Sequence, residues 1–331
     1  MRLTRRTALA GLGALALPGA AQAVEQTRFP VSVSARPFTA FEPRNPDRRR
    51  FGALQFRGGL VLNSGHPRFG GFSGLARPNE GRDLVAVTDR GYWLTARVRS
   101  QGGRPVGLDG VEMAAILGAS GRPLARSGLF DTESLCIADG MAYVGIERRH
   151  EIVRFDWASA GVEARARSVP VPPEIKRLPR NRGLEALGIV PAGPLKGALV
   201  AIAERSGKED EPTLGAILGG PQPGLFKVAR HDGYDITDLA FLPSGDMLLL
   251  ERWYQQLRGV GMSMRRIAGR DIRPGALVDG PRLIEADLGY EIDNMEGLSI
   301  HLENGRTVLT LISDDNFSFL QRTVLLEFEL V

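Results

Sequence analysis

A short hairpin pattern recurs five times along the chain, and it constrains the fold more than any other feature. The clearest copy runs from Thr132 to Glu147 as two apolar stretches joined by the turn dipeptide Asp139-Gly140. With this turn, Glu147 is expected across from Thr132 and diagonal to Glu133. The pattern therefore predicts a β-hairpin with two carboxylates at its open end.

The other copies also carry acids or hydroxyls at the open end. The first strands of the five copies begin with Ser73, Glu133, Glu185, Asp238 and Glu296. The second strands end with Asp89, Glu147, Glu204, Glu251 and Asp314. A turn at Ser244-Gly245 predicts that Asp238 lies directly opposite Glu251, and the turn at Asn304-Gly305 predicts that Asp314 lies opposite Met295, next to Glu296.

The spacing of these copies indicates the architecture. Their first positions are 60, 52, 53 and 58 residues apart, and periods near 50 residues built of strands and turns are typical of propeller blades. Residues 28–66 contain further strand-like segments that would supply a sixth blade, closed by residues 323–330. We therefore expect an all-β, six-bladed β-propeller, and seven or five blades are the less favoured alternatives. Residues 24–50 would be an N-terminal extension or closing strand, and 51–331 the propeller domain.

The first 23 residues have the pattern of an export signal. Arg5-Arg6 precedes an uncharged Ala/Leu/Gly run that ends in Ala21-Gln22-Ala23, a small-x-small cleavage site. The adjacent arginines favour a twin-arginine signal over an ordinary secretory one. We expect a periplasmic or secreted protein. No later apolar run approaches the ~20 residues of a membrane helix.

Composition excludes some classes of partner. The chain has 42 basic and 38 acidic residues, and removal of three signal-segment arginines leaves 39 basic residues. This balance gives no reason to expect nucleic-acid binding. Cys136 is the only cysteine, so no intramolecular disulfide can form, and it is expected to be a small buried apolar residue. We expect a monomer that acts on a small molecule.

Acids at one end of several innermost strands would converge on the propeller axis. Crowded carboxylates raise one another's pKa and favour a bound cation. Ca²⁺ takes six to eight oxygen ligands in flexible geometry and suits such a ring better than Mg²⁺. The predicted metal ligands are Asp89, Glu147, Glu204, Asp238, Glu251, Glu296, Asp314 and Asn316. The alternative is that the acids are solvated or pair with the arginines that follow them, as in Asp89-Arg90, and only join the blades.

Several motifs together resemble a known family. They are Phe72-Ser-Gly-Leu with Val87-Thr-Asp-Arg-Gly91, Asp131-Thr-Glu-Ser-Leu with Gly145-Ile-Glu-Arg, Asn181-Arg-Gly-Leu-Glu-Ala-Leu187, and Asn294-Met-Glu-Gly-Leu298 with Ser313-Asp-Asp-Asn316. In order and spacing they resemble the phytase-like family of exported bacterial proteins, also described as esterase-like, from about residue 50 to the C-terminus. The resemblance implies a β-propeller. By analogy with alkaline β-propeller phytases it also implies a calcium-dependent phosphoric ester hydrolase.

The resemblance also suggests roles for individual residues. Ca²⁺ would polarise an ester oxygen and activate water, and Glu133 or Glu185 would take a proton from that water. Arg90, Arg148, Arg205 or Arg252 would orient an anionic substrate. Alkaline phytases use several lysines and arginines around calcium, whereas this chain has few lysines. This difference argues against phytate itself as the substrate. Two alternatives are a calcium-dependent lactonase of the gluconolactonase or paraoxonase kind, and a non-catalytic periplasmic binding propeller.

Overall fold

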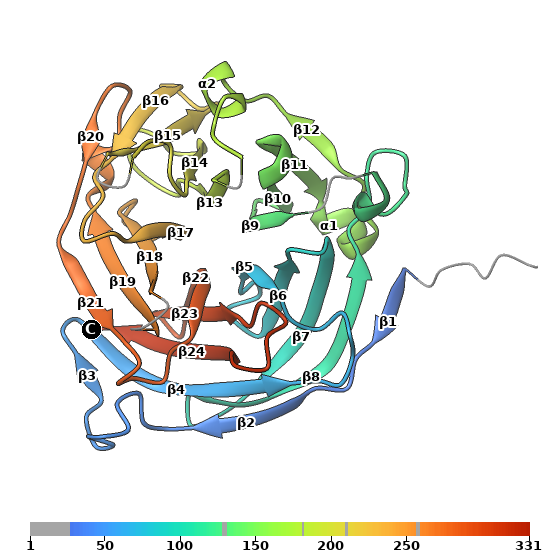
Figure 1. Cartoon of the computed structure of the whole chain (residues 1–331), viewed down its shortest axis with the longest axis vertical. Coiled ribbons are helices and arrows are strands. Elements are labelled where there is room, and N and C mark those ends of the chain that lie inside the picture. The colour runs from blue at the N-terminus through green and yellow to red at the C-terminus, as the bar shows by residue number, and fades with distance from the viewer. Residues whose placement is uncertain (1–26, 128–130, 181, 209–210, 256–258) are drawn as a thin grey trace, which may run out of the picture.

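The repeated hairpins form the innermost strands of sheets arranged in a ring around one axis (Figure 1). The computed structural model describes residues 27–127, 131–180, 182–208, 211–255 and 259–331. The predicted signal segment, residues 1–23, lies outside the described residues. Within them no helix is long and apolar enough to cross a membrane.

Each sheet is one blade, described from the axis outwards. The first blade contains β5 (Phe72–Ala76), β6 (Asp83–Thr88), β7 (Tyr92–Gln101), β8 (Arg104–Ala115) and β1 (Arg28–Pro30). The second contains β9 (Thr132–Ala138), β10 (Met141–Ile146), β11 (Glu151–Asp156) and β12 (Arg167–Val169). The third contains β13 (Leu184–Ile189), β14 (Leu199–Ala203), β15 (Thr213–Leu218), β16 (Gly224–Val228) and β20 (Leu277–Val278).

The last two blades complete the ring. The fourth contains β17 (Asp235–Phe241), β18 (Met247–Gln255), β19 (Gly259–Ile267) and β21 (Arg282–Ala286). The fifth contains β22 (Asn294–Glu303), β23 (Arg306–Asp314), β24 (Thr323–Leu330), β4 (Leu54–Asn63) and β2 (Ser34–Phe38), with β3 (Arg50–Phe51) paired to β4. Two four-residue helices, α1 (Trp157–Ala160) and α2 (Pro173–Lys176), lie in connections.

The described residues form five blades, so the prediction of six was wrong. The N-terminal segment adds outer strands to existing blades, because it lacks an inner hairpin of its own. β1 pairs with β8 of the first blade, and β4 pairs with β24 of the fifth. The antiparallel pairing of β4 with β24, with Val61 opposite Val324, joins the two ends of the chain and closes the ring.

The apolar core lies between neighbouring sheets. Leu248 and Leu250 of β18 pack with Leu309 and Leu311 of β23, so the fourth and fifth blades share one buried cluster. Similar clusters join the other blades. Alternation along each strand supplies one set of apolar side chains to each side of the sheet. This packing fixes the inner strands around the axis.

Every inner strand contains a β-bulge at the same place, and this changes the expected register. The residues left unpaired are Ser73, Glu133, Glu185, Thr237 and Glu296. A bulge leaves one residue out of the ladder and changes the direction of its side chain. The hairpin around Asp139-Gly140 keeps the predicted pairing only as far as Gly145 opposite Ser134, and then Ile146 pairs with Thr132.

The bulge corrects the predicted pairs in the fourth and fifth blades. Asp238 lies opposite Leu250, and Glu251 lies opposite Ile236, so these two acids do not face each other. In the fifth blade Asp314 lies opposite Asn294 instead of Met295. The prediction counted every residue of the inner strand as paired, and the unpaired bulge residue shifts the count by one.

Candidate functional site

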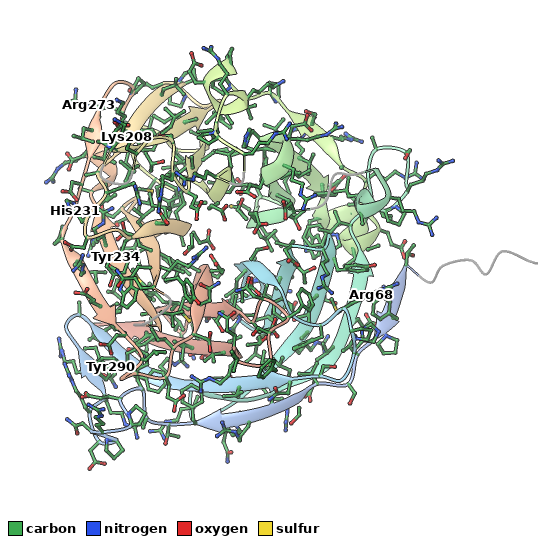
Figure 2. The ribbon with its side chains drawn as sticks, viewed as in Figure 1. Arg68, Lys208, His231, Tyr234, Arg273 and Tyr290 are labelled. Carbon is green, nitrogen blue, oxygen red and sulfur yellow. The ribbon has the colours of Figure 1, made fainter. Side chains whose placement is uncertain are left out.

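The corrected register defines two rows of side chains at one end of the inner strands. The bulge row contains Ser73, Glu133, Glu185, Thr237 and Glu296. The second row lies on the second strands. In each blade it is the residue that directly follows the partner of the residue before the bulge: Asp89, Glu147, Glu204, Arg252 and Asp314. Acids hold both positions in the second, third and fifth blades. Figure 2 shows side-chain oxygens around the middle of the ring.

Five acids of the second and third blades form two overlapping groups, which we call the carboxylate pair-site. One group contains Asp131, Glu133 and Glu147, and the other contains Glu147, Glu185 and Glu204. Within each group, one oxygen from every residue lies within 4.8 Å of the others. Glu147 belongs to both, so it connects the two blades.

The environment of the pair-site opposes ionisation. Burial raises the pKa of Glu133 well above its usual range, and the charges of Asp131 and Glu147 raise it further. Burial and the charge of Glu133 likewise raise the pKa of Glu185. For Glu204, burial raises the pKa to about 7 although nearby Arg252 lowers it. Without a cation, these carboxylates hold protons at pH values where exposed acids are ionised.

Acids elsewhere in the two rows show the same effect. Burial raises the pKa of Asp314 to about 8, and Glu296 adds to the rise. Burial raises the pKa of Asp89 to about 6 against the opposing influence of Arg90. The Oδ1 atom of Asp89 is buried and has no hydrogen-bond partner among the described residues.

Arg252 is the cation of this acidic network. Its Nε lies 2.7 Å from Glu296 Oε1, and its Nη2 lies 3.8 Å from Glu204 Oε1. The charge of Glu296 is the largest cause that raises the pKa of Arg252, so the guanidinium stays protonated. Its side chain is 26% exposed. Arg252 therefore neutralises the acids of the third and fifth blades and remains accessible from outside.

The pair-site has the chemistry that a hard cation requires. All its donors are carboxylate oxygens, the ligands that Ca²⁺ prefers. Glu147 is positioned by a hydrogen bond from Gly183 N to its Oε1 at 3.0 Å, and ligating carboxylates are commonly held by such contacts. The raised pKa values mark positions where a bound positive charge would relieve repulsion. The residues present thus fit a calcium ion.

Two predicted ligands are engaged elsewhere. Asp238 is fully buried, and its carboxylate accepts hydrogen bonds from Leu239 N at 2.8 Å and Leu298 N at 2.7 Å. It therefore joins the fourth blade to the fifth. Glu251 forms a buried two-point ion pair with Arg265, at 2.9 and 2.6 Å. The bulge places both acids outside the two rows, and their role as metal ligands stays a prediction.

Four further predicted ligands, Asp89, Glu296, Asp314 and Asn316, lie outside the pair-site. Glu296 Oε1 accepts a hydrogen bond from Asn294 Nδ2 at 2.8 Å in addition to its contact with Arg252. Asp314 Oδ1 accepts one from Asn316 N at 2.6 Å. These residues and Asp89 form the fifth- and first-blade side of the two rows. Their role as ligands stays a prediction.

Two of the predicted substrate arginines lie at the edge of the site. Arg148 Nε donates to Asp131 Oδ2 at 2.7 Å. The Arg90 guanidinium lies over the ring of Phe317, with its carbon 3.2 Å from the ring centroid. Both arginines are exposed. Their proposed contact with substrate is untested.

Sequence reasoning missed two residues of this region and did not place a third in the two rows. Asp131 begins the motif Asp131-Thr-Glu-Ser-Leu, but it precedes the strand and was not predicted as a ligand. The uncounted bulge concealed the positions of Thr237 and Arg252 in the two rows, although Arg252 was one of the arginines expected to orient a substrate. The Thr237 hydroxyl donates to Met295 O at 3.1 Å, and the Ser73 hydroxyl makes the equivalent bond to Thr132 O at 2.5 Å. These two hydroxyls therefore join adjacent blades at bulge positions that carry no acid.

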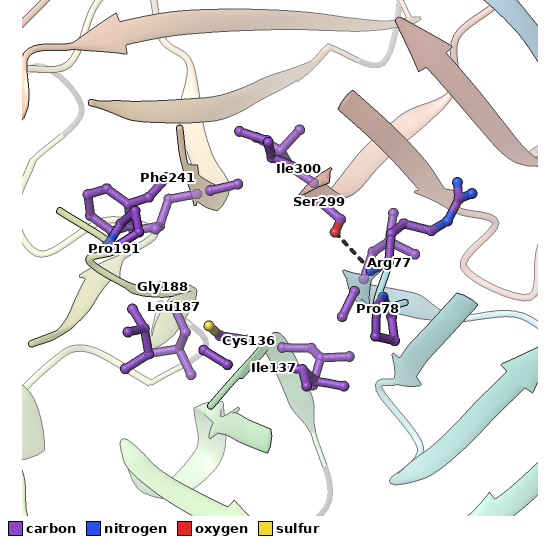
Figure 3. A pocket seen from close by; sticks show the side chains of 18 residues that line it. Arg77, Pro78, Cys136, Ile137, Leu187, Gly188, Pro191, Phe241, Ser299 and Ile300 are labelled. Carbon is purple, nitrogen blue, oxygen red and sulfur yellow. Dashed lines mark hydrogen bonds between the residues drawn. The ribbon is translucent and has the colours of Figure 1, made fainter. Parts of the chain in front are cut away.

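The other end of the inner strands carries mainly apolar side chains together with Arg77 and Ser299. A cavity of about 180 Å³ is lined there by residues that include Cys136, Ile137, Leu187 and Phe241 (Figure 3). Burial raises the pKa of the Cys136 thiol to about 12, so this thiol stays protonated and a poor nucleophile. The axis thus has an acidic end and a second end at which no acid is among the described residues that line the cavity.

Comparison with known proteins places the chain in a family. The chain is similar to a PQQ-bound aldose sugar dehydrogenase from Streptomyces coelicolor, with TM-score 0.41 and 13% identity over 82% of this chain and 97% of that chain. It is also similar to glutaminyl cyclase from Myxococcus xanthus, with TM-score 0.43 and 12% identity over 84% and 97%. No curated protein matches the sequence. A model of the phytase-like family, described as esterase-like activity of phytase, matches residues 67–317, which include all five inner strands. The chain therefore belongs to the phytase-like family.

Proposed function

We propose that this protein is an exported, calcium-dependent hydrolase of anionic esters, with phosphoric esters as the first class to test. The observation that carries the proposal is the carboxylate pair-site, in which Glu147 belongs to two groups of acids. Membership in the phytase-like family supports the same reading. The proposed export depends on the sequence pattern of residues 1–23 alone.

The pair-site residues would hold the metal. Asp131, Glu133 and Glu147 form one candidate set of ligands, and Glu147, Glu185 and Glu204 form the other. When bound, Ca²⁺ would supply positive charge that polarises an ester oxygen.

The chain's own residues would handle the proton and the substrate. Glu133 and Glu185 have pKa values raised by burial and crowding. A carboxylate of raised pKa that does not ligate the metal is a suitable general base near neutral pH. Arg252 lies beside Glu204, within the reach of an anionic group that enters the ring. Its planar guanidinium can make two parallel hydrogen bonds to a phosphoryl group.

The test is turnover by the mature protein with and without Ca²⁺. Substrates are p-nitrophenyl phosphate, a bis-ester of phosphate, p-nitrophenyl acetate and a γ-lactone. The key variant carries Glu133→Gln and Glu185→Gln, and Asp139→Asn is the control because Asp139 lies at the far turn of the same hairpin. We expect calcium-dependent release of phosphate or phosphate monoester that is lost in the double variant and kept in the control.

Other outcomes select other functions. Turnover of lactone alone would replace the proposal with a lactonase. No turnover by a folded protein, even where calcium raises its melting temperature, would indicate a binding propeller and contradict the proposed hydrolase.

A further inference from the structure

We propose that a cavity between the fourth and fifth blades binds an alkyl or aryl group of the substrate, so that the preferred esters carry one anionic group attached to an apolar group. This inference rests on the proposed function and specifies its substrate class. The cavity has a volume of about 520 Å³, within the range of about 300–1,000 Å³ typical of small-molecule pockets. Its floor contains Arg252 and its wall contains Tyr254, Leu288 and Leu320.

The wall exposes large apolar side chains to solvent. Tyr254 is 62% exposed, Leu288 is 60% exposed and Leu320 is 78% exposed. They come from β18, from the segment between β21 and β22, and from the segment between β23 and β24. Single exposed apolar residues are ordinary, but three that line one concave surface mark a binding site for an apolar group.

The floor connects this cavity to the acidic rows. Arg252 contacts Glu296 and Glu204 through Nε and Nη2. Its side chain is 26% exposed, so the guanidinium can donate further hydrogen bonds to a ligand. Asn294 and Asn316 also line the cavity, and each donates a hydrogen bond to an acid of the two rows. An anionic group on Arg252 would therefore lie at the junction of the cavity and the acidic network.

The charges of the cavity limit the number of anionic groups that it can hold. Among the described residues that line it, Arg252 is the one cation and Asp293 the one acid. Asp293 already accepts hydrogen bonds from Asn294 N at 3.0 Å and Arg322 N at 3.0 Å. A ligand with many phosphates requires many cationic donors. This cavity instead matches one phosphoryl or carboxyl group followed by an apolar chain.

The test measures binding without turnover. Hexylphosphonate, methylphosphonate and inositol hexakisphosphate are titrated into the mature protein by calorimetry, with Ca²⁺ and with EDTA. We expect hexylphosphonate to bind about tenfold or more tightly than methylphosphonate, because several methylene groups leave water. Leu288→Gln and Tyr254→Ser should reduce that ratio about tenfold. Leu277→Gln is the matched control, since Leu277 is also 60% exposed but lies on β20.

The outcomes separate this inference from the proposed function. Equal binding of the two alkylphosphonates, tightest binding of inositol hexakisphosphate, or a preference that survives Leu288→Gln would each overturn the apolar pocket, even if calcium-dependent hydrolysis is found. Tight, Leu288-dependent binding of hexylphosphonate by a protein that hydrolyses no ester would support the pocket and contradict the hydrolase.

Discussion

The guanidinium of Arg252 lies 2.7 Å from the carboxylate of Glu296, across the boundary between the fourth and fifth blades. Arg252 occupies the position that Glu147 and Glu204 hold in the second and third blades. The fourth blade also replaces the bulge acid with Thr237. One blade of the ring thus contributes a cation instead of two acids, and this asymmetry separates the pair-site from Glu296 and Asp314.

Replacing Arg252 tests whether it stabilises the acidic network. Arg252→Gln leaves Glu296 buried without its cation, which costs less than in a dry core because the arginine is 26% exposed. We expect the free energy of unfolding to fall by about 2 kcal/mol at pH 8 without calcium, and by less as the pH falls, because burial raises the pKa of Glu296 and protonation removes its charge. Urea denaturation measures the change. Arg99→Gln, in a pair that is 57% and 58% exposed, should change stability by at most about 0.5 kcal/mol, and equal losses in the two variants would contradict the role of Arg252.

The raised pKa values predict how pH affects the metal-free protein. Asp89, Glu204 and Asp314 have folded pKa values of about 6, 7 and 8, above those of an unfolded chain, about 4. Between pH 4 and 8 the folded state binds more protons than the unfolded state. The stabilisation that these three groups contribute is therefore fully present below pH 4 and is lost as the pH rises through their folded pKa values towards 8. Each group contributes a slope of at most about 1.4 kcal/mol per pH unit.

Melting temperatures from pH 4 to 9 measure this effect. In EDTA the stability should decrease over that range, and Asp314→Asn should remove its upper part. With excess calcium the decrease should be smaller, because cations bind ionised carboxylates and shift the equilibrium towards the folded state. A metal-free protein that becomes more stable between pH 5 and 8 would show that these acids are not held protonated.

Much of the fold could be predicted from residue patterns. Turn dipeptides such as Asp139-Gly140 and the recurrence of apolar strand pairs identified the propeller and all five inner hairpins. The prediction of six blades was wrong because residues 28–66 have the composition of strands, and composition does not determine which sheet a strand joins. Pairing of β4 with β24 is a long-range contact, and no local signal specifies it.

The site was less predictable because a bulge has no reliable sequence signal. Glu133 and Glu185 were identified from the repeated pattern because both are acids at the start of a first strand, and both occupy bulge positions in the structure. In the fourth blade the bulge residue is Thr237, and the adjacent Asp238 was taken for it. A shift of one residue moves a strand side chain to the other face, which explains why Asp238 and Glu251 make buried contacts outside the two rows.

The shared position of Glu147 predicts that it dominates metal binding. Glu147→Gln removes a charge from both groups of the pair-site but keeps an oxygen that can accept from Gly183 N. Calcium affinity, measured by calorimetry, should fall by more than about tenfold, and by more than in Glu133→Gln or Glu185→Gln, which each alter one group. Asp139→Asn is the control and should bind calcium normally. If the three pair-site variants lose affinity equally, Glu147 does not connect two sites.

The ion pair of Glu251 with Arg265 predicts the opposite behaviour. Both side chains are 2% exposed, so Glu251→Gln leaves the buried Arg265 with Asp279, which is 49% exposed, as its remaining ion-pair partner. The free energy of unfolding should fall by about 3 kcal/mol, the lower end of the range for a broken buried pair. A second variant, Glu251→Gln with Arg265→Gln, should regain part of that loss, because it removes the buried guanidinium charge and leaves Asp279 exposed and hydrogen-bonded to His231. The folded protein should bind calcium with unchanged affinity in both variants. Loss of calcium binding from either well-folded variant would return Glu251 to the metal site and contradict the register that the bulge imposes on the fourth blade.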